Sequence, residues 1–290
     1  MLTIEKNILA ALLRIAACMM SGLCLYSTLL AGEPVKTAEQ PPALSAQNIL
    51  GMMHQRIARI EAHDFRLKVE ERWQGNHIHR GEVKVSAQLR PLQIRVELLK
   101  PEEGPLVEYP AENNPRLATV IPKKWLPALK FGRDIHGETL RKGHYAINET
   151  TFAFFDGLIR RMEQQFRMQG RYQESVRYLG TVQVAGKTCH RVEMIDAQYR
   201  LLPYEIQPGD DLIRLGKRLL LSPYKIRELN PQLSSYFDLK PGQILTLPSS
   251  YSRRTILLID AQKMVPRVLE VYDEKGRFER YCFEDIVIKQ

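Results

Sequence analysis

The sequence is poor in cysteine and carries none of the common catalytic motifs. Only 4 of its 290 residues are cysteine. It has no nucleophile elbow, no His-Glu-x-x-His, no glycine-rich phosphate loop and no evident pair of catalytic cysteine and histidine. No tract is simple enough in composition to indicate disorder or collagen. We therefore expect a folded protein that is not an enzyme and holds neither a cofactor nor a metal.

Positive charge prevails in the sequence but is not concentrated in one region. The formal net charge is +9, and lysine and arginine are spread along the chain instead of forming one tail. Such a spread indicates a solvated surface, with a weak attraction to anionic lipid or an acidic wall polymer as the alternative. No motif that reads nucleic acid accompanies the charge, so nucleic acid is not an expected partner.

Residues 1–32 have the layout of a secretory signal. Lys6 and Arg14 precede an uncharged stretch, 15–31, which ends in small residues before Glu33. An uncleaved anchor is the alternative, because a membrane span needs about 20 apolar residues and 8–31 reaches that length if Arg14 is tolerated near one end. The sequence thus predicts an exported protein of the periplasm or cell envelope, free or anchored in the inner membrane.

Two of the four cysteines, Cys18 and Cys24, lie in this N-terminal segment. Residues 15–18 loosely resemble a lipoprotein cleavage box, but the apolar run continues far past Cys18. The remaining pair, Cys189 and Cys282, can form a disulfide in an oxidising compartment. Both lie in strand-like runs, so two separate buried thiols are an equally good interpretation.

The periodicity of apolar residues divides the rest of the chain. Residues 33–46 are rich in proline and predict an extended linker. Ser45 can cap a helix that carries Ile49, Met53 and Ile57 on one face. From Asp64 the period changes to two, and strands are predicted at 64–73, 81–89, 92–98, 106–109, 117–121 and 145–147.

A second helix is predicted at 152–168, followed by strands at 177–184 and 188–195 that Ala185-Gly186-Lys187 joins as a hairpin. Strand patterns resume at 255–259, 267–272 and 278–288. Sequential strands with short turns predict an antiparallel sheet, and helices would cover one face. The sheet domain is therefore expected in two parts, 47–203 and 249–290, around an insert at 204–248.

The insert carries three separated motifs. Tyr-Glu-Ile-Gln-Pro-Gly-Asp-Asp-Leu begins at 204, Leu-Asn-Pro-Gln-Leu begins at 229, and Leu-Lys-Pro-Gly-Gln-Ile-Leu-Thr-Leu-Pro ends at 248. Together they resemble the LysM family over its full length. The residues themselves predict a strand, a helix capped by Asp210, a helix capped by Ser222 with Pro223 at its first position, and a closing strand.

The resemblance implies binding of N-acetylated glycans such as peptidoglycan in a shallow groove, largely through backbone groups. The residues that match the family's binding loops are Gly209, Asp210, Asp211, Leu212, Asn230, Pro231, Gln232 and Leu233. Each has a structural alternative as a turn, cap or helix-stop residue. The family usually has Gly-Asp-Thr where this chain has Gly209-Asp210-Asp211, and the extra carboxylate is expected to weaken or redirect glycan binding.

The sheet domain resembles the LolA and LolB type of outer-membrane lipoprotein carriers. The resemblance rests mainly on the closing segment, which has Ile259-Asp260, Pro266-Arg267 and the turn 272–276. It implies an α+β fold, a half-barrel of strongly curved antiparallel sheet covered by helices, with a concave face that can hold lipid. Four aromatic residues are candidates to line such a cavity or to form plain core: Trp125, Phe152, Phe154 and Phe155.

His77 and His79 have the i, i+2 spacing of metal ligands on a strand, and His63 lies on the preceding strand. No further potential ligand lies at a sequence spacing that is typical of a metal site. The favoured hypothesis is a non-catalytic envelope protein that binds peptidoglycan through the insert and a lipid, lipoprotein or protein partner through the sheet. A lipid or lipoprotein carrier with a purely structural insert, and a metal-dependent hydrolase, are the alternatives.

Overall fold

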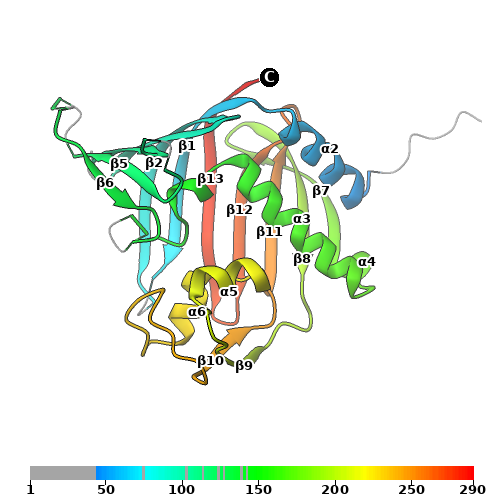
Figure 1. Ribbon diagram of the computed structural model, residues 1–290. Coiled ribbons are helices and arrows are strands. Elements are labelled where there is room, and N and C mark those ends of the chain that lie inside the picture. Colours follow the sequence, from blue (N-terminus) through cyan, green and yellow to red (C-terminus); the bar gives the residue numbers. More distant parts are fainter. Residues whose placement is uncertain are drawn as a thin grey trace, which may run out of the picture. The chain divides into compact units, whose positions relative to one another are not determined.

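The computed structural model describes residues 44–290 except 74–75, 102–103, 113, 123–124, 127, 138–139 and 142. Among them, eleven strands form one antiparallel sheet in the order β6-β5-β4-β3-β2-β1-β13-β12-β11-β8-β7, which curves strongly and leaves β6 and β7 as open edges (Figure 1). The strands are β1 Ala62–Arg72, β2 Ile78–Leu89, β3 Leu92–Lys100, β4 Leu106–Tyr109, β5 Leu117–Ile121, β6 Phe131–Asp134, β7 Val176–Val184, β8 Lys187–Ile195, β11 Arg254–Asp260, β12 Pro266–Asp273 and β13 Gly276–Lys289.

Alternation of side chains decides which face of the sheet is buried. In β1, Phe65 and Leu67 are buried, whereas Arg66 and Lys68 lie on the opposite face. The predicted hairpin between β7 and β8 is confirmed, with Ala185 and Gly186 at φ values of 47° and 73°. Two successive residues in the left-handed region are typical of the tight turns that suit the twist of a hairpin.

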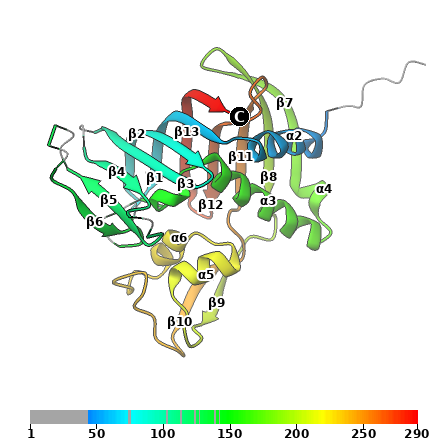
Figure 2. The same cartoon turned by 45° about the horizontal axis from the view of Figure 1, so that its top comes forward.

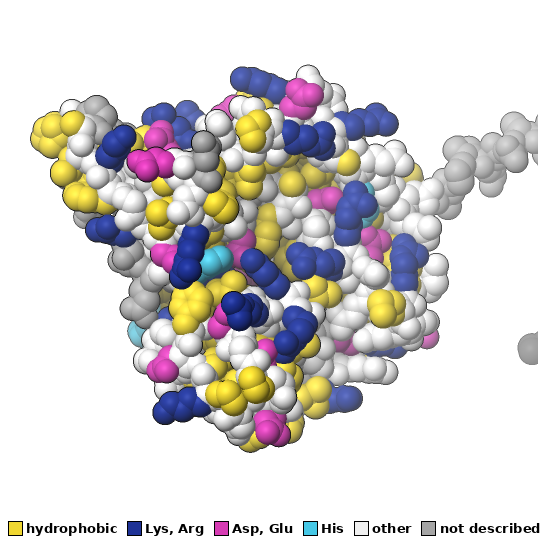
Figure 3. Space-filling model, viewed as in Figure 1, with side chains coloured by type: hydrophobic (Ala, Val, Ile, Leu, Met, Phe, Trp, Pro, Cys, Tyr) yellow, Lys and Arg dark blue, Asp and Glu magenta, His cyan; other side chains and the backbone are white. Residues whose placement is uncertain are grey.

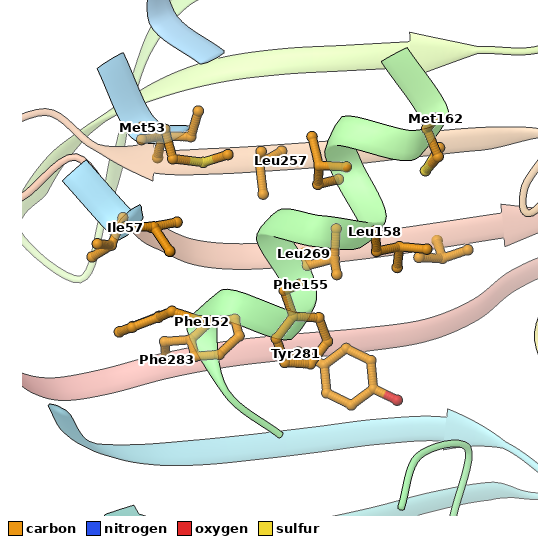
Figure 4. Close-up of a cluster of buried hydrophobic side chains, with 14 of the residues drawn as sticks. Met53, Ile57, Phe152, Phe155, Leu158, Met162, Leu257, Leu269, Tyr281 and Phe283 are labelled. Atoms are coloured by element: carbon orange, nitrogen blue, oxygen red, sulfur yellow. The ribbon is translucent and has the colours of Figure 1, made fainter. Parts of the chain in front are cut away.

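Helices α2 (Ala46–Ala58) and α3 (Phe152–Met168) lie on the concave side of the sheet (Figures 1 and 2). The hydroxyl of Thr151 accepts a hydrogen bond from the Phe154 amide at 3.2 Å and caps α3. The helix turns Phe152, Phe155, Leu158 and Met162 toward the strands, where Leu257, Leu269, Tyr281 and Phe283 meet them (Figure 4). Phe152 and Phe155 are thus part of the core.

His54 links the two helices, because it lies between Asp156 and Glu163 of α3. Its Nδ1 bonds to Asp156 and its Nε2 lies 2.6 Å from Glu163 Oε2. Burial alone would lower the pKa of His54, but the hydrogen bonds and charges of the two carboxylates raise it. Burial alone would raise the pKa of Glu163, but hydrogen bonds from His54 and Tyr172 lower it. Both shifts favour the charged forms of His54 and Glu163.

The insert forms β9 (Leu201–Glu205), α5 (Leu212–Leu219), α6 (Pro223–Leu229) and β10 (Ile244–Pro248). It occupies the connection between β8 and β11, which are neighbours in the large sheet, and lies at one end of that sheet (Figure 2). Its ends are held together, since the Ser249 amide donates to the Arg200 carbonyl at 2.8 Å and the Arg200 amide to Ser249 Oγ at 3.0 Å. Its own core contains Ile206, Leu212, Leu215, Ile226, Leu245 and Leu247.

The predicted fold class, the helix at 152–168 and the strand-helix-helix-strand order of the insert are confirmed. The strand predicted at 145–147 is wrong: the short 3-10 helix η1 (Ile147–Glu149) begins there, because the Glu149 carboxylate accepts a hydrogen bond from the Ala146 amide at 2.8 Å. Strand β6 and the short helix α4 (Tyr172–Ser175) were not predicted. The predicted signal or anchor and linker residues 33–43 lie outside the described residues, among which no helix is long and apolar enough to cross a membrane.

Candidate functional site

The first loop of the insert, residues 207–211, is organised by Asp210. Its carboxylate accepts hydrogen bonds from the Gln207 amide at 3.0 Å and the Tyr204 hydroxyl at 3.1 Å, and it pairs with Arg218 at 2.9 Å. Burial alone would raise the pKa of Asp210, but these contacts lower it. The predicted helix cap at Asp210 is wrong, because Asp211 accepts from the Arg214 amide at 2.7 Å and caps α5. Asp210 instead fixes the loop.

The second loop begins at Asn230, whose buried side chain joins α6 to β10. Its amide nitrogen donates to the Ile226 carbonyl at 2.7 Å and the Thr246 carbonyl at 2.8 Å, and its oxygen accepts from the Thr246 amide at 2.9 Å. The two loops meet where the Leu212 amide donates to the Tyr236 carbonyl at 2.9 Å. This side-chain arrangement leaves Asn230 with a structural role.

The structure brings the eight predicted glycan-binding residues together on these two loops but exposes only some of them. The side chains of Asp210, Leu212, Asn230 and Leu233 are buried within the insert. Gly209, Pro231 and Gln232 are exposed, and Asp211 is half-buried. A ligand on this surface would therefore meet the backbone and a few exposed side chains.

A groove of about 420 Å³ lies beside the first loop. The insert contributes Asp211, Ile213, Arg214, Lys217 and Phe237 to the groove, and the sheet domain contributes Pro115, Arg116, Asp134 and His136. The Phe237 side chain is 49% exposed, although it is apolar and lies in a polar loop. The aromatic pair Tyr236-Phe237 in a loop that also contains Ser234, Ser235 and Asp238 is the sequence signal that could have identified it. Arg116 has no such signal.

A buried ionic cluster fixes the insert to the sheet domain. Lys225 of α6 is 2% exposed and places its Nζ 2.6 Å from Asp273 and 2.8 Å from Glu228. Arg72 of β1 bonds to the same two carboxylates. Burial alone would lower the pKa of Lys225, but the hydrogen bonds to Asp273, Glu228 and Glu274 raise it. These charges are all compensated within the cluster, so the module cannot turn without separating ion pairs.

The concave side of the sheet contains an apolar pocket of about 360 Å³ between β1–β4 and residues 140–155. Its size falls within the range of small-ligand sites, which are mostly apolar with a few polar groups. The apolar lining comprises Leu67, Val69, Trp73, Val83, Val96, Leu98, Pro101, Pro105, Val107, Leu140, Ile147 and Phe155. Phe155 thus packs in the core and also lines this pocket, so both alternatives given for it apply.

One end of this pocket is polar and lined by Glu71, Tyr145 and Tyr281. The Tyr281 hydroxyl donates to Glu71 at 2.5 Å, and Tyr145 donates to Glu279 at 2.7 Å. Burial and the charge of Glu279 raise the pKa of both tyrosines well above its usual range. The hydroxyls thus remain protonated donors that satisfy the carboxylates.

The three histidines proposed as metal ligands do not converge. His63 pairs with Ala87 in the β1–β2 ladder whereas His79 pairs with Glu71, so eight positions of β1 separate them. Eight positions of a strand span about 26 Å. His63 is buried against Phe152, and His79 stacks on Trp73 with ring centroids 4.1 Å apart. Among the described residues, no three His, Cys, Asp or Glu side chains come close enough to hold a metal ion.

Of the two interpretations of Cys189 and Cys282, the structure agrees with two separate thiols and not with a disulfide, because both residues are free. Cys189 lies on β8 and Cys282 on β13, and β11 and β12 run between them. Three strand spacings amount to about 14 Å, whereas the Cα atoms of a disulfide lie within about 7 Å. The predicted cavity role of Trp125 is also wrong, because its side chain is 78% exposed.

Residues 204–248 match the family model of the LysM domain. The insert is a LysM module. The boundaries of the match coincide with those predicted from the motifs. Of the eight residues that the resemblance nominated, Asp211 lines the groove, and the other seven lie on the adjoining loops outside its lining. No curated protein matches the sequence.

Most of the chain is similar in fold to several solved structures. A chain in the complex structure of Pseudomonas aeruginosa MucA/MucB is 10% identical, with a TM-score of 0.39, and the match covers 84% of this chain and 57% of that one. A LolA superfamily protein from Nitrosomonas europaea is 9% identical, with a TM-score of 0.29 and coverages of 86% and 95%. A putative outer membrane lipoprotein-sorting protein domain from Vibrio parahaemolyticus is 11% identical, with a TM-score of 0.32 and coverages of 84% and 94%.

Proposed function

We propose that this protein binds N-acetylated glycan, and peptidoglycan in particular, through its LysM module, and that it does so in the cell envelope without catalysing a reaction. The observation that carries the proposal is the full-length LysM match, together with two loops that present exposed backbone at Gly209, Pro231 and Gln232. The buried side chains of Asp210 and Asn230 hold those loops in place. The loops are thus preorganised, which lowers the entropic cost of binding.

Phe237 offers the sharpest test of this groove. Its exposed ring is suited to pack on the apolar face of a sugar, so Phe237→Ala should reduce retention on purified peptidoglycan about tenfold in co-sedimentation. Leu202→Ala is the matched control, because Leu202 is a 38% exposed apolar residue on β9 of the same module. Retention unchanged by Phe237→Ala, or lost equally in both variants, would contradict the proposed groove.

Point variants test the module better than its deletion. Removing residues 204–248 also removes Lys225 and Glu228 from the cluster around Arg72 and Asp273. Truncating one side of a buried ion cluster destabilises what remains. If the deleted chain failed to bind, the cause could be the loss of the glycan site or the destabilisation of the remaining chain. A substitution of an exposed residue leaves the buried cluster intact, so a loss of binding would then report on the site alone.

The apolar pocket favours a second function, the binding of an acyl chain or another apolar group of a lipid, lipoprotein or protein partner. Its walls are mostly apolar, with Trp73 and Phe155 among aliphatic side chains. The polar end at Glu71, Tyr145 and Tyr281 can orient a polar headgroup. In the carrier alternative this pocket would be the working site and the LysM module a structural element.

Native mass spectrometry of protein purified from membranes should then show a bound acyl species. Val83→Trp places a large side chain in the pocket and should abolish that species. Val287→Trp adds the same side chain at a 53% exposed position of β13 and should leave it in place. Protein that carries no acyl species in any of these forms would rule out the carrier alternative.

A further inference from the structure

Two parts of the chain that are distant in sequence form the walls of the groove. On one side lie the LysM residues Asp211, Arg214 and Lys217, and on the other Arg116 and Asp134, next to the ends of β5 and β6. The buried cluster around Lys225 holds the module against the sheet domain. Any glycan that lies along the first loop of the module therefore also faces the sheet domain.

The charges in this groove do not cancel. Asp134 pairs with Arg116 at 2.8 Å, and Asp211 pairs with Arg214 at 3.2 Å. Lys217 is exposed and makes no hydrogen bond or ion pair with a described residue. Burial and the nearby charges of Arg141 and Lys217 lower the pKa of His136, so His136 is neutral at pH 7. One positive charge is left over at Lys217.

The side chains around the groove also carry positive charge. Figure 3 shows lysine and arginine side chains gathered over α5 and the adjoining α3. Arg161 of α3 and Lys217 of α5 line one small cavity between these helices. Arg214 and Arg218 lie on α5 as well, each paired with an aspartate. Positive side chains around a groove attract an anionic ligand and strengthen its hydrogen bonds. An uncharged sugar chain gains nothing from them.

From the charge and the two walls, we infer that the groove selects N-acetylated glycan that carries a carboxylate, of the muramic acid class, over an uncharged N-acetylglucosamine chain. Lys217 supplies the charge, and Arg116 extends the site into the sheet domain. This inference rests on the proposed glycan-binding function and names its substrate class.

Calorimetric titration of the full chain with two oligosaccharides of equal length tests the selection. One is the N-acetylglucosamine tetramer, and the other alternates N-acetylglucosamine with N-acetylmuramic acid and has no peptide. A single charge contact in a solvated site predicts about fivefold tighter binding of the muramic acid oligosaccharide at low salt, an advantage that added salt reduces. Equal affinities would overturn the selection but leave glycan binding intact, whereas no binding of either would contradict the proposed function itself.

Three charge variants locate the effect. Lys217→Gln should make the two affinities equal, because it weakens the binding of the muramic acid oligosaccharide only. Arg116→Gln should reduce the affinity ratio between the two oligosaccharides about twofold. Lys187→Gln removes the same charge from the exposed β7–β8 hairpin, next to the sheet edge opposite β6, and should change nothing. An advantage that survives Lys217→Gln would overturn the assignment of Lys217, and one that survives Arg116→Gln would overturn the contribution of the sheet domain.

Discussion

The two faces of the LysM module differ in what they do with charge. On the face toward the sheet, Lys225 and Glu228 are buried with Arg72 and Asp273, and every charge has a partner. On the groove face, Lys217 is exposed and has no described partner, and the backbone of the loops is open to solvent. The first face fixes the orientation of the module, and the second is left free to meet a ligand.

This contrast has a physical cause. Moving a charge out of water is costly, and the cost is met only when partners and hydrogen bonds surround it. The buried cluster meets that condition, so it specifies one docking geometry without leaving donors for a ligand. A groove that must exchange a ligand for water keeps its charges solvated and weakly paired. We therefore expect substitutions on the buried face to change stability and those on the groove face to change binding.

The largest expected effect is on the buried face. Lys225→Met keeps the length of the side chain but leaves Asp273 and Glu228 with one cation fewer, and should lower the free energy of unfolding by about 3 kcal/mol. Lys217→Met, on the exposed face of the same module, should change it by less than about 0.5 kcal/mol. Urea unfolding measures both. Equal effects of the two variants would contradict the division into faces.

An intermediate effect is expected at another buried cationic side chain, His54, which extends the comparison to the sheet domain. His54→Gln removes a charged hydrogen-bond partner from Asp156 and Glu163 and should cost about 2 kcal/mol near pH 6. A raised pKa of His54 means that its contribution is complete below its unfolded value of about 6.5 and is lost as pH rises through the folded pKa. The lowered pKa of Glu163 removes the contribution again as pH falls below about 4.5.

Thermal unfolding of the wild type and His54→Gln across this range measures the difference between them. The difference should be largest between about pH 4.5 and 6.5 and should shrink toward pH 9. His190→Gln is a suitable control, because His190 is half-buried on β8 and contacts neither carboxylate. A difference that stays constant from pH 5 to 9 would show that His54 does not act through its charge.

The smallest expected effect is at Asp211, on the groove face. Asp211→Thr retains a side chain that can cap α5, so stability should change by less than about 0.5 kcal/mol. It removes a carboxylate from the groove, and peptidoglycan retention should rise two- to threefold. Asp238→Thr removes a carboxylate from an exposed loop position outside the groove lining and serves as the control. Weaker retention by Asp211→Thr would show that the carboxylate itself contacts the glycan.

Local features of the fold could be predicted from the sequence. Ser45 and Ser222 cap the helices that follow them, as expected, because a cap involves residues only three positions apart. The predicted cap of α5, Asp210, is wrong by one residue, because Asp211 caps the helix. Both have side chains able to cap, and only the contact of Asp210 with Tyr204 and Arg218 decides which is used.

Contacts between distant residues could not be predicted in the same way. Arg72 and Asp273 are separated by 201 positions, and no local sequence pattern pairs them. The groove wall at Arg116 depends on how the module docks, which in turn depends on that cluster. The sequence motifs therefore located the two loops that we propose bind glycan, whereas the residues that would give the groove its selectivity became evident only from the folded chain.

The central claim is that glycan binds in the LysM groove while facing the sheet domain, and amide chemical shifts measured during titration with the muramic acid oligosaccharide test it most directly. We predict that the shifts concentrate in the loops 207–212 and 230–237 and extend across the groove to Arg116 and His136. Shifts confined to residues outside the groove, or no shifts in either loop at saturating oligosaccharide, would contradict the claim.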